Sequence, residues 1–247
     1  MSNATDTYEI ARMYKYLRLC DVVDALDCVG RPDITLVDNA IRPLFPGTRF
    51  WGPAVTMRAL PSNHPMRVLP REDAQLAQKL WYEEVPSKSR ELNQYLRPGC
   101  VVVMDAHGCR EVGLWGSNNS LGVLEKGAVG IVTDGYARDT AELATWHAPI
   151  AARARGRTYR PGRAFISDVQ VPISCGGALV RPGDIVGCDD DGVVVVPFEV
   201  AEEVGKIACD TLIGDERSRR AIYERTGHPL DDSVDIEMLE EFYKPWR

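Results

Sequence analysis

The chain has 247 residues, of which 45% are hydrophobic and 26% charged, and its formal net charge is −7 at neutral pH. This length and composition are typical of a globular protein with one large domain or two small ones. The negative charge argues against a nucleic-acid partner, because the chain has no excess of basic residues to neutralise phosphates. The seven scattered cysteines, the polar N-terminus and the lack of a long apolar run predict a reduced, cytoplasmic protein that does not enter a membrane.

In chain order, helix and strand signals alternate, with Gly and Pro residues between them. Helices are expected at residues 8–26, 72–84, 116–126 and 140–146, and from residue 199 onward. Strands are expected at residues 54–60, 100–105, 128–133, 149–152, 169–174, 178–180, 185–188 and 193–196. Trp51-Gly52-Pro53 and Asp189-Asp190-Asp191-Gly192 are expected to form turns, and the second lacks the spaced oxygen ligands of a calcium loop.

This order of elements predicts an α/β fold with mixed sheets, because strand–helix–strand units are followed by a run of short strands. We expect one domain at residues 1–214, with a polar, proline-punctuated excursion or lid at about 61–97. Residues 215–247 are strongly charged and are expected to form a helical C-terminal extension.

The most informative stretch is residues 130–139, an apolar run that reaches Asp134-Gly135 and then the adjacent pair Arg138-Asp139. We expect Asp134-Gly135 to end the strand in a turn, and strand ends in open α/β sheets carry ligand sites. Arg138 offers a fork for an anion, and Asp139 offers a hard oxygen ligand for a divalent metal. Two structural alternatives remain: Asp139 caps the next helix together with Glu142, and Arg138 forms a salt bridge.

The segment Gly113–Asn119 combines glycines with small polar residues at the start of a helix. Free N–H groups and the positive end of the helix dipole make such a loop a natural anion cradle. The loop is not a Walker A motif, and simple helix capping by Ser117 or Asn118 is the alternative. A third candidate is the loop from Asp105 to Glu111, which is either an acid–base or metal group or an ordinary polar loop.

Longer motifs connect these sites. They are Asp24-Ala-Leu-Asp27 with Gly30, Pro98-Gly99-x-Val-Val-Val-x-Asp105, Trp115-Gly116, Gly127-x-x-Gly130-x-Val-x-Asp134-Gly135-x-x-Arg138-Asp139, Val171-Pro-Ile-Ser-Cys-Gly-Gly177 and the stretch from Val180 to Pro197. Together they resemble the family that joins the regulator of ribonuclease activity A (RraA) to the 4-hydroxy-4-methyl-2-oxoglutarate aldolases. The resemblance covers roughly residues 10 to 210.

The resemblance implies a compact α/β/β sandwich of the swivelling-domain type, assembled as a trimer or a dimer of trimers with active sites at subunit interfaces. It implies that Asp139 binds Mg²⁺ or Mn²⁺ and that Arg138 engages a pyruvate-like α-keto acid. The substrate carboxylate would be received by the loop residues Gly116, Ser117, Asn118 and Asn119. The implied reaction is aldol cleavage or decarboxylation of a small keto acid through a pyruvate enolate, which the metal stabilises as a Lewis acid.

The chain departs from the family at Ser117, because family members commonly have an acidic residue directly after the Trp-Gly glycine. A hydroxyl is a weaker ligand and cannot act as a carboxylate base. Asn118 and Asn119 are expected to donate to substrate oxygens, and Asp105 or His107 to supply a base. The departure also leaves open a non-catalytic protein that inhibits a ribonuclease, or another metal-assisted hydrolase or isomerase reaction in the same pocket.

Overall fold

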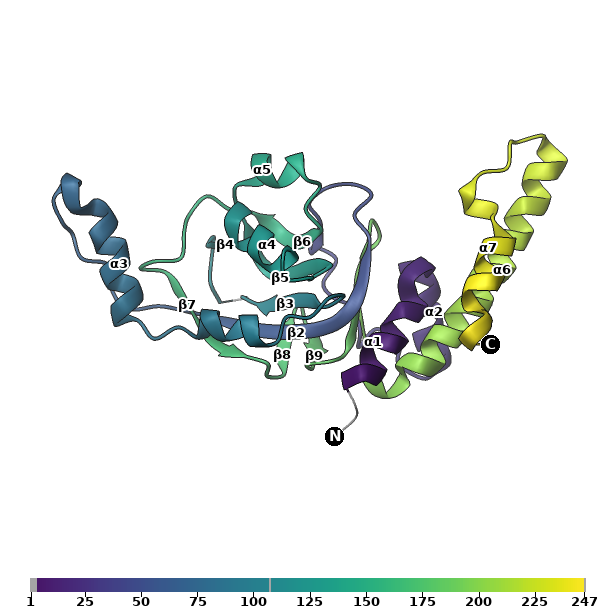
Figure 1. The fold of residues 1–247 in the computed structure, drawn as a ribbon, viewed down its shortest axis with the longest axis horizontal. Helices are drawn as coiled ribbons and strands as arrows, with labels where there is room; N and C mark the ends of the chain where they lie inside the picture. The colour runs from purple at the N-terminus through teal and green to yellow at the C-terminus, as the bar shows by residue number, and fades with distance from the viewer. Residues whose placement is uncertain (1–3, 107, 247) are drawn as a thin grey trace.

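The computed structural model describes residues 4–106 and 108–246, which form seven α-helices around a curved sheet (Figure 1). The helices are α1 (Ala4–Met13), α2 (Leu19–Cys28), α3 (Ala74–Glu84), α4 (Ser117–Leu124), α5 (Thr140–Thr145), α6 (Phe198–Thr226) and α7 (Ile236–Tyr243). Short 3₁₀ segments lie at Tyr14–Tyr16, Arg71–Asp73, Lys88–Gln94, Asp232–Val234 and Lys244–Trp246. Among the described helices, none is both long and apolar enough to cross a bilayer.

The strands are β1 (Arg42–Pro43), β2 (Phe50–Pro61), β3 (Val101–Asp105), β4 (Gly113–Trp115), β5 (Gly130–Ala137), β6 (Ile150–Arg155), β7 (Ala164–Val169), β8 (Ile173–Cys175), β9 (Ala178–Val180), β10 (Ile185–Asp189) and β11 (Gly192–Val196). Nine of them form one sheet in the order β1-β6-β5-β3-β2-β10-β11, with β4 added beside β5 and β7 beside β2. The central strands β2, β3, β5 and β6 are parallel neighbours, and β1, β7, β10 and β11 are antiparallel to theirs. The predicted α/β fold with a mixed sheet is confirmed.

The sheet curves until its two ends approach each other. Arg42 Nη1 on β1 donates to the Asp190 carbonyl in the β10–β11 turn at 3.2 Å. The Gly47 amide donates to the carboxylate of the same Asp190 at 2.9 Å. The residues Asp189–Gly192 therefore form the predicted hairpin turn, and this turn also closes the sheet.

The central strand β3 is buried on both faces, as its continuous apolar sequence predicts. Val102 and Met104 belong to the apolar cluster that lies toward α4 and α5. Val101 and Val103 belong to the cluster on the other face, with residues of the β8–β9 ribbon. A third cluster joins α1, α2, α6 and α7 at one end of the molecule. The core therefore holds β3 and β5 rigidly, and the candidate site follows directly from the end of β5.

The expected N-terminal helix over residues 8–26 is wrong as a single helix, because α1 and α2 are separated at Leu17 and Arg18, which are extended. The Leu17 carbonyl leaves the helical pattern to accept hydrogen bonds from Trp51 Nε1 at 3.1 Å and from Arg49 Nη2 at 2.6 Å. The start of α2 is capped from outside, since the Leu19 amide donates to Asp189 Oδ2 at 2.9 Å. Tertiary contacts thus override the helical periodicity.

The turn expected at Trp51-Gly52-Pro53 is also wrong, because these residues lie inside β2. Pro53 stands opposite Ile185 of β10, and pairing with β3 begins only at Ala54. Gly52 is required at this point, since a Cβ atom there would stand 2.0 Å from the Gly99 carbonyl oxygen. Glycine and proline here allow a close approach of two backbones and do not reverse the chain.

The strand β5 continues through Asp134-Gly135, where the sequence predicts a turn, so that prediction is wrong. Its pairing with β6 shifts register between Thr133 and Tyr136, which makes this dipeptide a bulge within the strand. The Asp134 carboxylate accepts hydrogen bonds from the Ala106 amide at 2.7 Å and from the Gly176 amide at 3.2 Å. Asp134 therefore ties β5 to the end of β3 and to the β8–β9 ribbon.

The single strand expected at residues 169–174 is likewise wrong, since β7 ends at Val169 and β8 begins at Ile173. Gln170 has a positive φ of 59°, which interrupts the extended backbone. The strands β1 and β4 are two and three residues long and carry no recognisable sequence pattern. Their existence depends on their neighbours β6 and β5.

Two helical arms project from opposite ends of the molecule (Figure 1). One carries α3 and belongs to the excursion at about 61–97. The other consists of α7 and the end of α6, a helix of 29 residues that runs past residue 214 without a break. All seven cysteines are free thiols, and five of them are buried.

Candidate active site

The pair Arg138-Asp139 lies directly after β5, and its backbone is fixed by β4. The Arg138 amide donates to the Trp115 carbonyl at 2.8 Å. Asp139 has the left-handed backbone angles φ 56° and ψ 38°. A non-glycine residue in this conformation costs of order 1–3 kcal/mol and is typical of functional sites.

The Asp139 carboxylate points to the N-terminus of α4. Its Oδ2 accepts a hydrogen bond from the Ser117 amide at 3.1 Å, and the Ser117 hydroxyl lies 3.5 Å from the same oxygen. The side chain caps nothing on α5, the helix that it precedes. The alternative in which Asp139 and Glu142 form a capping box on α5 is therefore wrong. The carboxylate instead occupies the anion-binding end of the helix 22 residues earlier in the chain.

Arg138 lies beside this carboxylate, with its Nε 3.7 Å from Asp139 Oδ2. The two side chains are 37% and 36% exposed, so both can reach a molecule from solvent. Two glycines make room for them. A Cβ atom on Gly113 would stand 2.7 Å from Arg138 Cβ, and one on Gly116 would stand 2.5 Å from Asp139 Oδ2. Neither glycine can carry a side chain while the pair keeps this position.

The donor atoms at this site determine which kind of divalent metal it can hold. Among the described residues, Asp139 Oδ1 accepts no hydrogen bond, so one carboxylate oxygen is available as a ligand. No cluster of three or more His, Cys, Asp or Glu side chains that could enclose a metal exists in the described part of the chain. Mg²⁺ is commonly held by one or two carboxylates together with water and substrate oxygens. The residues fit an ion of that kind, shared with a substrate, and do not fit a metal enclosed by protein alone.

The loop predicted to bind a substrate carboxylate divides between two surfaces. Gly116 and Ser117 face the Arg138-Asp139 pair. Asn118 and Asn119 are exposed and line a cavity of about 250 Å³ on the other side, which we call the α4 cavity. The α4 cavity is lined by Met57, Ser89, Arg90, Leu92, Asn93, Met104, Leu114, Trp115, Asn118, Asn119, Gly122, Val123, Lys126, Arg160 and Ile166.

In the loop from Asp105 to Glu111, the two end residues form ion pairs with arginines other than Arg138. The Asp105 carboxylate lies 3.3 Å from Arg58 Nε, in an ion pair at the end of β3. Glu111 pairs with Arg157 Nε at 2.8 Å. Burial raises the pKa of the Cys109 thiol to about 11, so this cysteine stays protonated at neutral pH. His107, the other base suggested by the sequence, lies outside the described residues.

Sequence reasoning missed the cations of the α4 cavity, Arg90, Lys126 and Arg160. They come from the excursion, from the residues after α4 and from the loop before β7. These three residues are too far apart along the chain to form a sequence motif, and only the fold brings them together.

The chain is similar to known proteins in both sequence and structure. A family model described as RraA-like, Aldolase/RraA, matches residues 19–195. A protein of Halalkalibacterium halodurans with the provisional name 4-hydroxy-4-methyl-2-oxoglutarate aldolase is 32% identical over 203 residues, which are 81% of this chain and 82% of that protein. Protein DlpA of Legionella pneumophila is 27% identical over 92% of this chain, and the chain spans 33% of its length.

Two solved structures are similar to this chain over most of its length. The crystal structure of RraAS2 from Streptomyces coelicolor, described as an unusual member of the RNase ES inhibitor RraA protein family, aligns with a TM-score of 0.68 and 29% identity. The alignment covers 85% of this chain and 96% of the RraAS2 chain. An uncharacterized protein from Pseudomonas syringae pv. tomato aligns with a TM-score of 0.67 and 27% identity, covering 94% and 96%. Because the family model spans most of the sequence, the chain belongs to the RraA-like family, Aldolase/RraA.

Proposed function

We propose that this protein is a divalent-metal-dependent lyase that forms a pyruvate enolate from a small α-keto acid, by decarboxylation or aldol cleavage. The observation that carries the proposal is the Arg138-Asp139 pair held beside the N-terminus of α4. The 32% identity to a protein provisionally named as an aldolase supports it. We further propose that the ion is Mg²⁺ or Mn²⁺, with Asp139 as its protein ligand, and that the chain works as a homo-oligomer.

Asp139 and Arg138 have different roles in the proposed reaction. Asp139 Oδ2 accepts a hydrogen bond from the Ser117 amide, which orients the carboxylate and leaves Oδ1 as the oxygen that would hold the ion. The bound ion would act as a Lewis acid toward the keto acid and lower the energy of the developing negative charge. Arg138 lies where its guanidinium can pair with the substrate carboxylate or with the enolate oxygen as charge develops.

The choice between the two reactions depends on a base. In aldol cleavage a proton leaves the hydroxyl as the carbon–carbon bond breaks, so a base is needed. In decarboxylation the carbon next to the ketone loses its carboxylate: that carbon–carbon bond breaks, its electron pair forms the enolate, CO₂ leaves and solvent protonates the carbon. The described residues that contact the Asp139 carboxylate are Ser117 and Arg138, and neither is a base at neutral pH. This set of residues favours decarboxylation.

The test is release of CO₂ and pyruvate from a panel of small keto acids, with Mg²⁺, with Mn²⁺ and with EDTA. Asp139→Asn is the main variant, because the amide oxygen can still accept the Ser117 hydrogen bond and preserve the start of α4. We expect turnover to fall to the background in EDTA and in this variant. Glu125→Gln, an exposed change beyond the last turn of α4, is the control. Full activity in EDTA or in Asp139→Asn would refute the proposal.

A second candidate function is inhibition of a ribonuclease by surface binding, without catalysis. It is favoured by the similarity to RraAS2 and by Ser117, which stands where the family resemblance implies an acid. A purified ribonuclease of the RNase ES type, assayed for RNA cleavage with and without this protein, separates the two functions. Inhibition that persists in Asp139→Asn, together with no turnover of any keto acid, would support this second candidate.

A further inference from the structure

A second cavity lies between the N-terminal helices, the sheet and the C-terminal arm, and we call it the α1 cavity. It is bounded by α1, the first residues of β2, the Pro98-Gly99 turn and Phe242 of α7, and its volume is about 520 Å³. Figure 1 shows α1 and α2 between the sheet and the arm that α6 and α7 form. Small-molecule sites in proteins have volumes of about 300–1,000 Å³, so this cavity is large enough for a ligand.

One face of the N-terminal helical segment lines the α1 cavity. It carries four lining residues at the spacing i, i+3, i+4 and i+7, which are Tyr8, Ala11, Arg12 and Lys15. Ala11 is buried and leaves room beside the sheet, whereas the side chains of Arg12 and Lys15 are exposed. This face therefore places two cations at the rim of the cavity and a small apolar residue at its floor.

The cations of the α1 cavity are not neutralised by carboxylates. No Asp or Glu stands among the described residues that line it, and the described part of the chain gives Arg12 no ion pair. The Lys15 amine lies 4.7 Å from the centre of the Tyr16 ring, which leaves its charge in place. A third lining cation, Arg49, donates to the backbone carbonyls of Tyr16 and Leu17, which are neutral acceptors. Grouped cations in a concave surface concentrate anions, although the whole chain has a net charge of −7.

The floor of the α1 cavity is apolar and fixed in position. Phe50 and Trp51, at the start of β2, are 5% and 9% exposed. A Cβ atom on Gly130 would stand 2.3 Å from Phe50 Cδ2, and one on Gly187 would stand 2.0 Å from Trp51 Cζ3, so both rings pack against backbone. Side chains that are already fixed lose little freedom when a ligand binds. The floor can therefore receive a flat apolar surface without rearrangement.

Two partly buried aromatic residues, Tyr8 and Phe242, complete the walls. Their rings offer further flat surface to a ligand. The Tyr8 hydroxyl has no hydrogen-bond partner among the described residues. Burial raises the pKa of Tyr8 to about 12, against the opposing charge of Arg97, so this hydroxyl remains a donor at neutral pH. The walls therefore supply aromatic contacts together with one more donor for a charged group.

The α1 cavity is separate from the Arg138-Asp139 pair. Pro98 and Gly99 come shortly before β3, whereas Arg138 and Asp139 directly follow β5. Because β3 and β5 are parallel neighbours, the start of one and the end of the other lie at opposite edges of the sheet. The eight residues of β5 span about 25 Å at about 3.3 Å per residue. A small ligand in the α1 cavity is therefore distinct from a reactant at Arg138 and Asp139.

We infer that the α1 cavity binds a flat aromatic molecule that carries an anionic group, at a site independent of the proposed reaction. Arg12 and Lys15 would hold the anionic group at the rim, and the ring would lie against the floor that Phe50 and Trp51 form. An aliphatic anion would leave the flat walls unused, and an uncharged ring would leave the cations unpaired. An aromatic carboxylate and a nucleoside phosphate both have this chemistry, and the test separates them.

The test measures binding by calorimetry in EDTA, so that no divalent metal supports binding at Asp139. AMP and benzoate represent the two sources of the ligand. Adenosine has the ring without the charge, and hexanoate has the charge without the ring. We expect AMP or benzoate to bind about tenfold or more tightly than both adenosine and hexanoate. Tighter binding of AMP assigns the site to a phosphate, and tighter binding of benzoate assigns it to a ring carboxylate.

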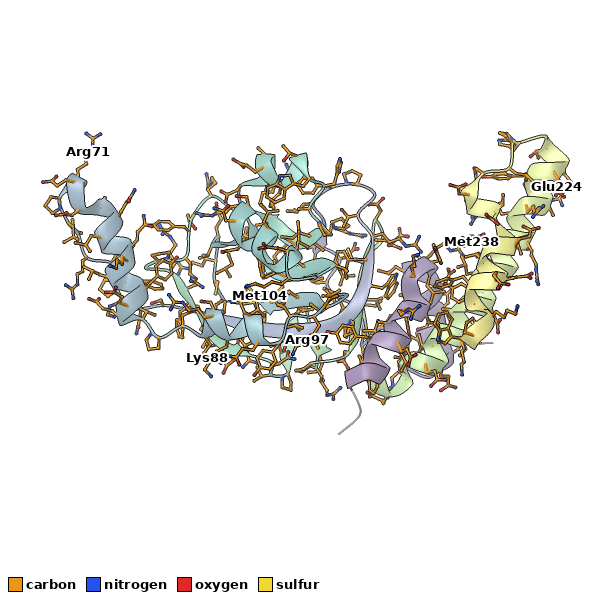
Figure 2. All side chains as sticks on the ribbon, in the orientation of Figure 1. Arg71, Lys88, Arg97, Met104, Glu224 and Met238 are labelled. Carbon is orange, nitrogen blue, oxygen red and sulfur yellow. The ribbon has the colours of Figure 1, made fainter. Side chains whose placement is uncertain are left out.

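Arg12→Met and Lys15→Met each remove one charge and keep an unbranched side chain. Both positions are exposed, so we expect the melting temperature to stay unchanged. Loss of one charged hydrogen bond weakens binding about tenfold or more, and we expect that loss in both variants. The matched control is Arg71→Met, which should bind like the intact chain. Figure 2 shows Arg71 at the tip of the arm that carries α3, far from α1.

Tyr8→Phe keeps the ring and removes only the hydroxyl. Because this hydroxyl has no partner among the described residues, the variant should keep its melting temperature and bind the anion more weakly. The inference would be overturned if neither AMP nor benzoate bound, or if adenosine or hexanoate bound as tightly as they do. It would also be overturned if Arg12→Met and Lys15→Met behaved like Arg71→Met. Keto-acid turnover enters none of these measurements, so failure of the proposed lyase function leaves the site in place.

Discussion

Gly116 and Asp139 lie so close together that a Cβ atom on Gly116 would stand 2.5 Å from Asp139 Oδ2. The same atom would stand 3.1 Å from Arg138 Nε. The backbone angles of Gly116 are φ −106° and ψ 176°, which other residues adopt readily. Glycine is therefore required here by the neighbouring side chains and not by its own backbone.

Gly116→Ala should affect the activity of the protein much more than its stability. The alanine would push Asp139 and Arg138 out of place, and misplacement of about 1 Å at a catalytic group costs about 10²-fold in rate. The stability should fall by only about 1 kcal/mol, since alanine is a poorer N-cap than glycine. Steady-state kinetics and thermal unfolding measure the two effects.

The matched control is Gly214→Ala, an exposed glycine of α6 whose Cβ atom would meet nothing within 4 Å. Replacing a helical glycine by alanine should stabilise the chain by about 1 kcal/mol and leave the activity unchanged. If Gly116→Ala retained full activity, the contact with Asp139 would have no bearing on the reaction.

Ser117→Asp introduces the acid that the family resemblance implies at this position. A second carboxylate beside Asp139 adds a hard ligand of the same sign, and more ligand charge tightens the hold on a divalent cation. The start of α4 also favours a negative side chain, which limits the structural cost. We expect Mg²⁺ affinity, measured by calorimetry, to rise about tenfold, and Ser117→Ala to leave it near the level of the intact chain. Weaker binding in Ser117→Asp would place the ion elsewhere.

Glu216 should make the stability of the chain depend on pH. Its side chain is buried on α6, and its Oε2 has no partner among the described residues. Burial raises its pKa above the ordinary value, partly opposed by Arg219 and Arg18 and reinforced by Asp21 and Asp235. The folded chain therefore holds this proton more tightly than the unfolded chain does.

The stability that this proton contributes is present below the ordinary carboxyl pKa and is lost as the pH rises through the raised value. Glu216→Gln keeps the shape without the charge. It should raise the stability at pH 7.5 by about 1 kcal/mol, or about 2–4 °C in melting temperature, and have no effect near pH 4. Glu203→Gln, an exposed change on the same helix, should show no such difference. A Glu216→Gln effect of equal size at both pH values would contradict the assignment.

Trp81 anchors the excursion. The side chain is 1% exposed, and its Nε1 donates to the His64 carbonyl at 3.2 Å. Trp81→Ala should cost about 3–5 kcal/mol locally, because a large buried ring leaves a cavity. Limited proteolysis and amide exchange should show faster cleavage and exchange within residues 62–97. Leu76→Ala, an exposed change on the same helix, is the control.

Much of the fold could be predicted because local patterns and burial agree. The run Val101–Met104 is continuous and apolar, and it forms a strand buried on both faces. The excursion helix α3 begins and ends close to its expected bounds. In these segments the neighbours reinforce what the local sequence already favours.

The wrong predictions fall where distant residues decide the backbone. Leu17 leaves its helix because Trp51 and Arg49 take its carbonyl as an acceptor. The Asp134-Gly135 dipeptide has a turn-like sequence, yet pairing with β6 and β4 carries the strand to Ala137, four residues beyond the expected end at Thr133. No local pattern contains the position of those partners.

In the candidate site, too, the residues could be predicted from local sequence and their arrangement could not. Arg138, Asp139 and Ser117 could be selected from the sequence, since their chemistry and their family motif are local. Their mutual arrangement was not predictable, because Asp139 was equally suited to cap the helix that follows it. The cations of the α4 cavity had no local signal at all, since Arg90 and Lys126 meet only after the excursion packs beside α4.

The bulge at Asp134-Gly135 has a consequence for how this site can change. Side chains of a strand alternate between its two faces, so one extra residue reverses the facing of everything that follows. Deleting Gly135 would turn the residues after it to the opposite face and carry Arg138 away from α4. An insertion or deletion of one residue in β5 thus moves Arg138 from one face of the strand to the other. Substitutions in the first turn of α4 change the surroundings of the site without moving it.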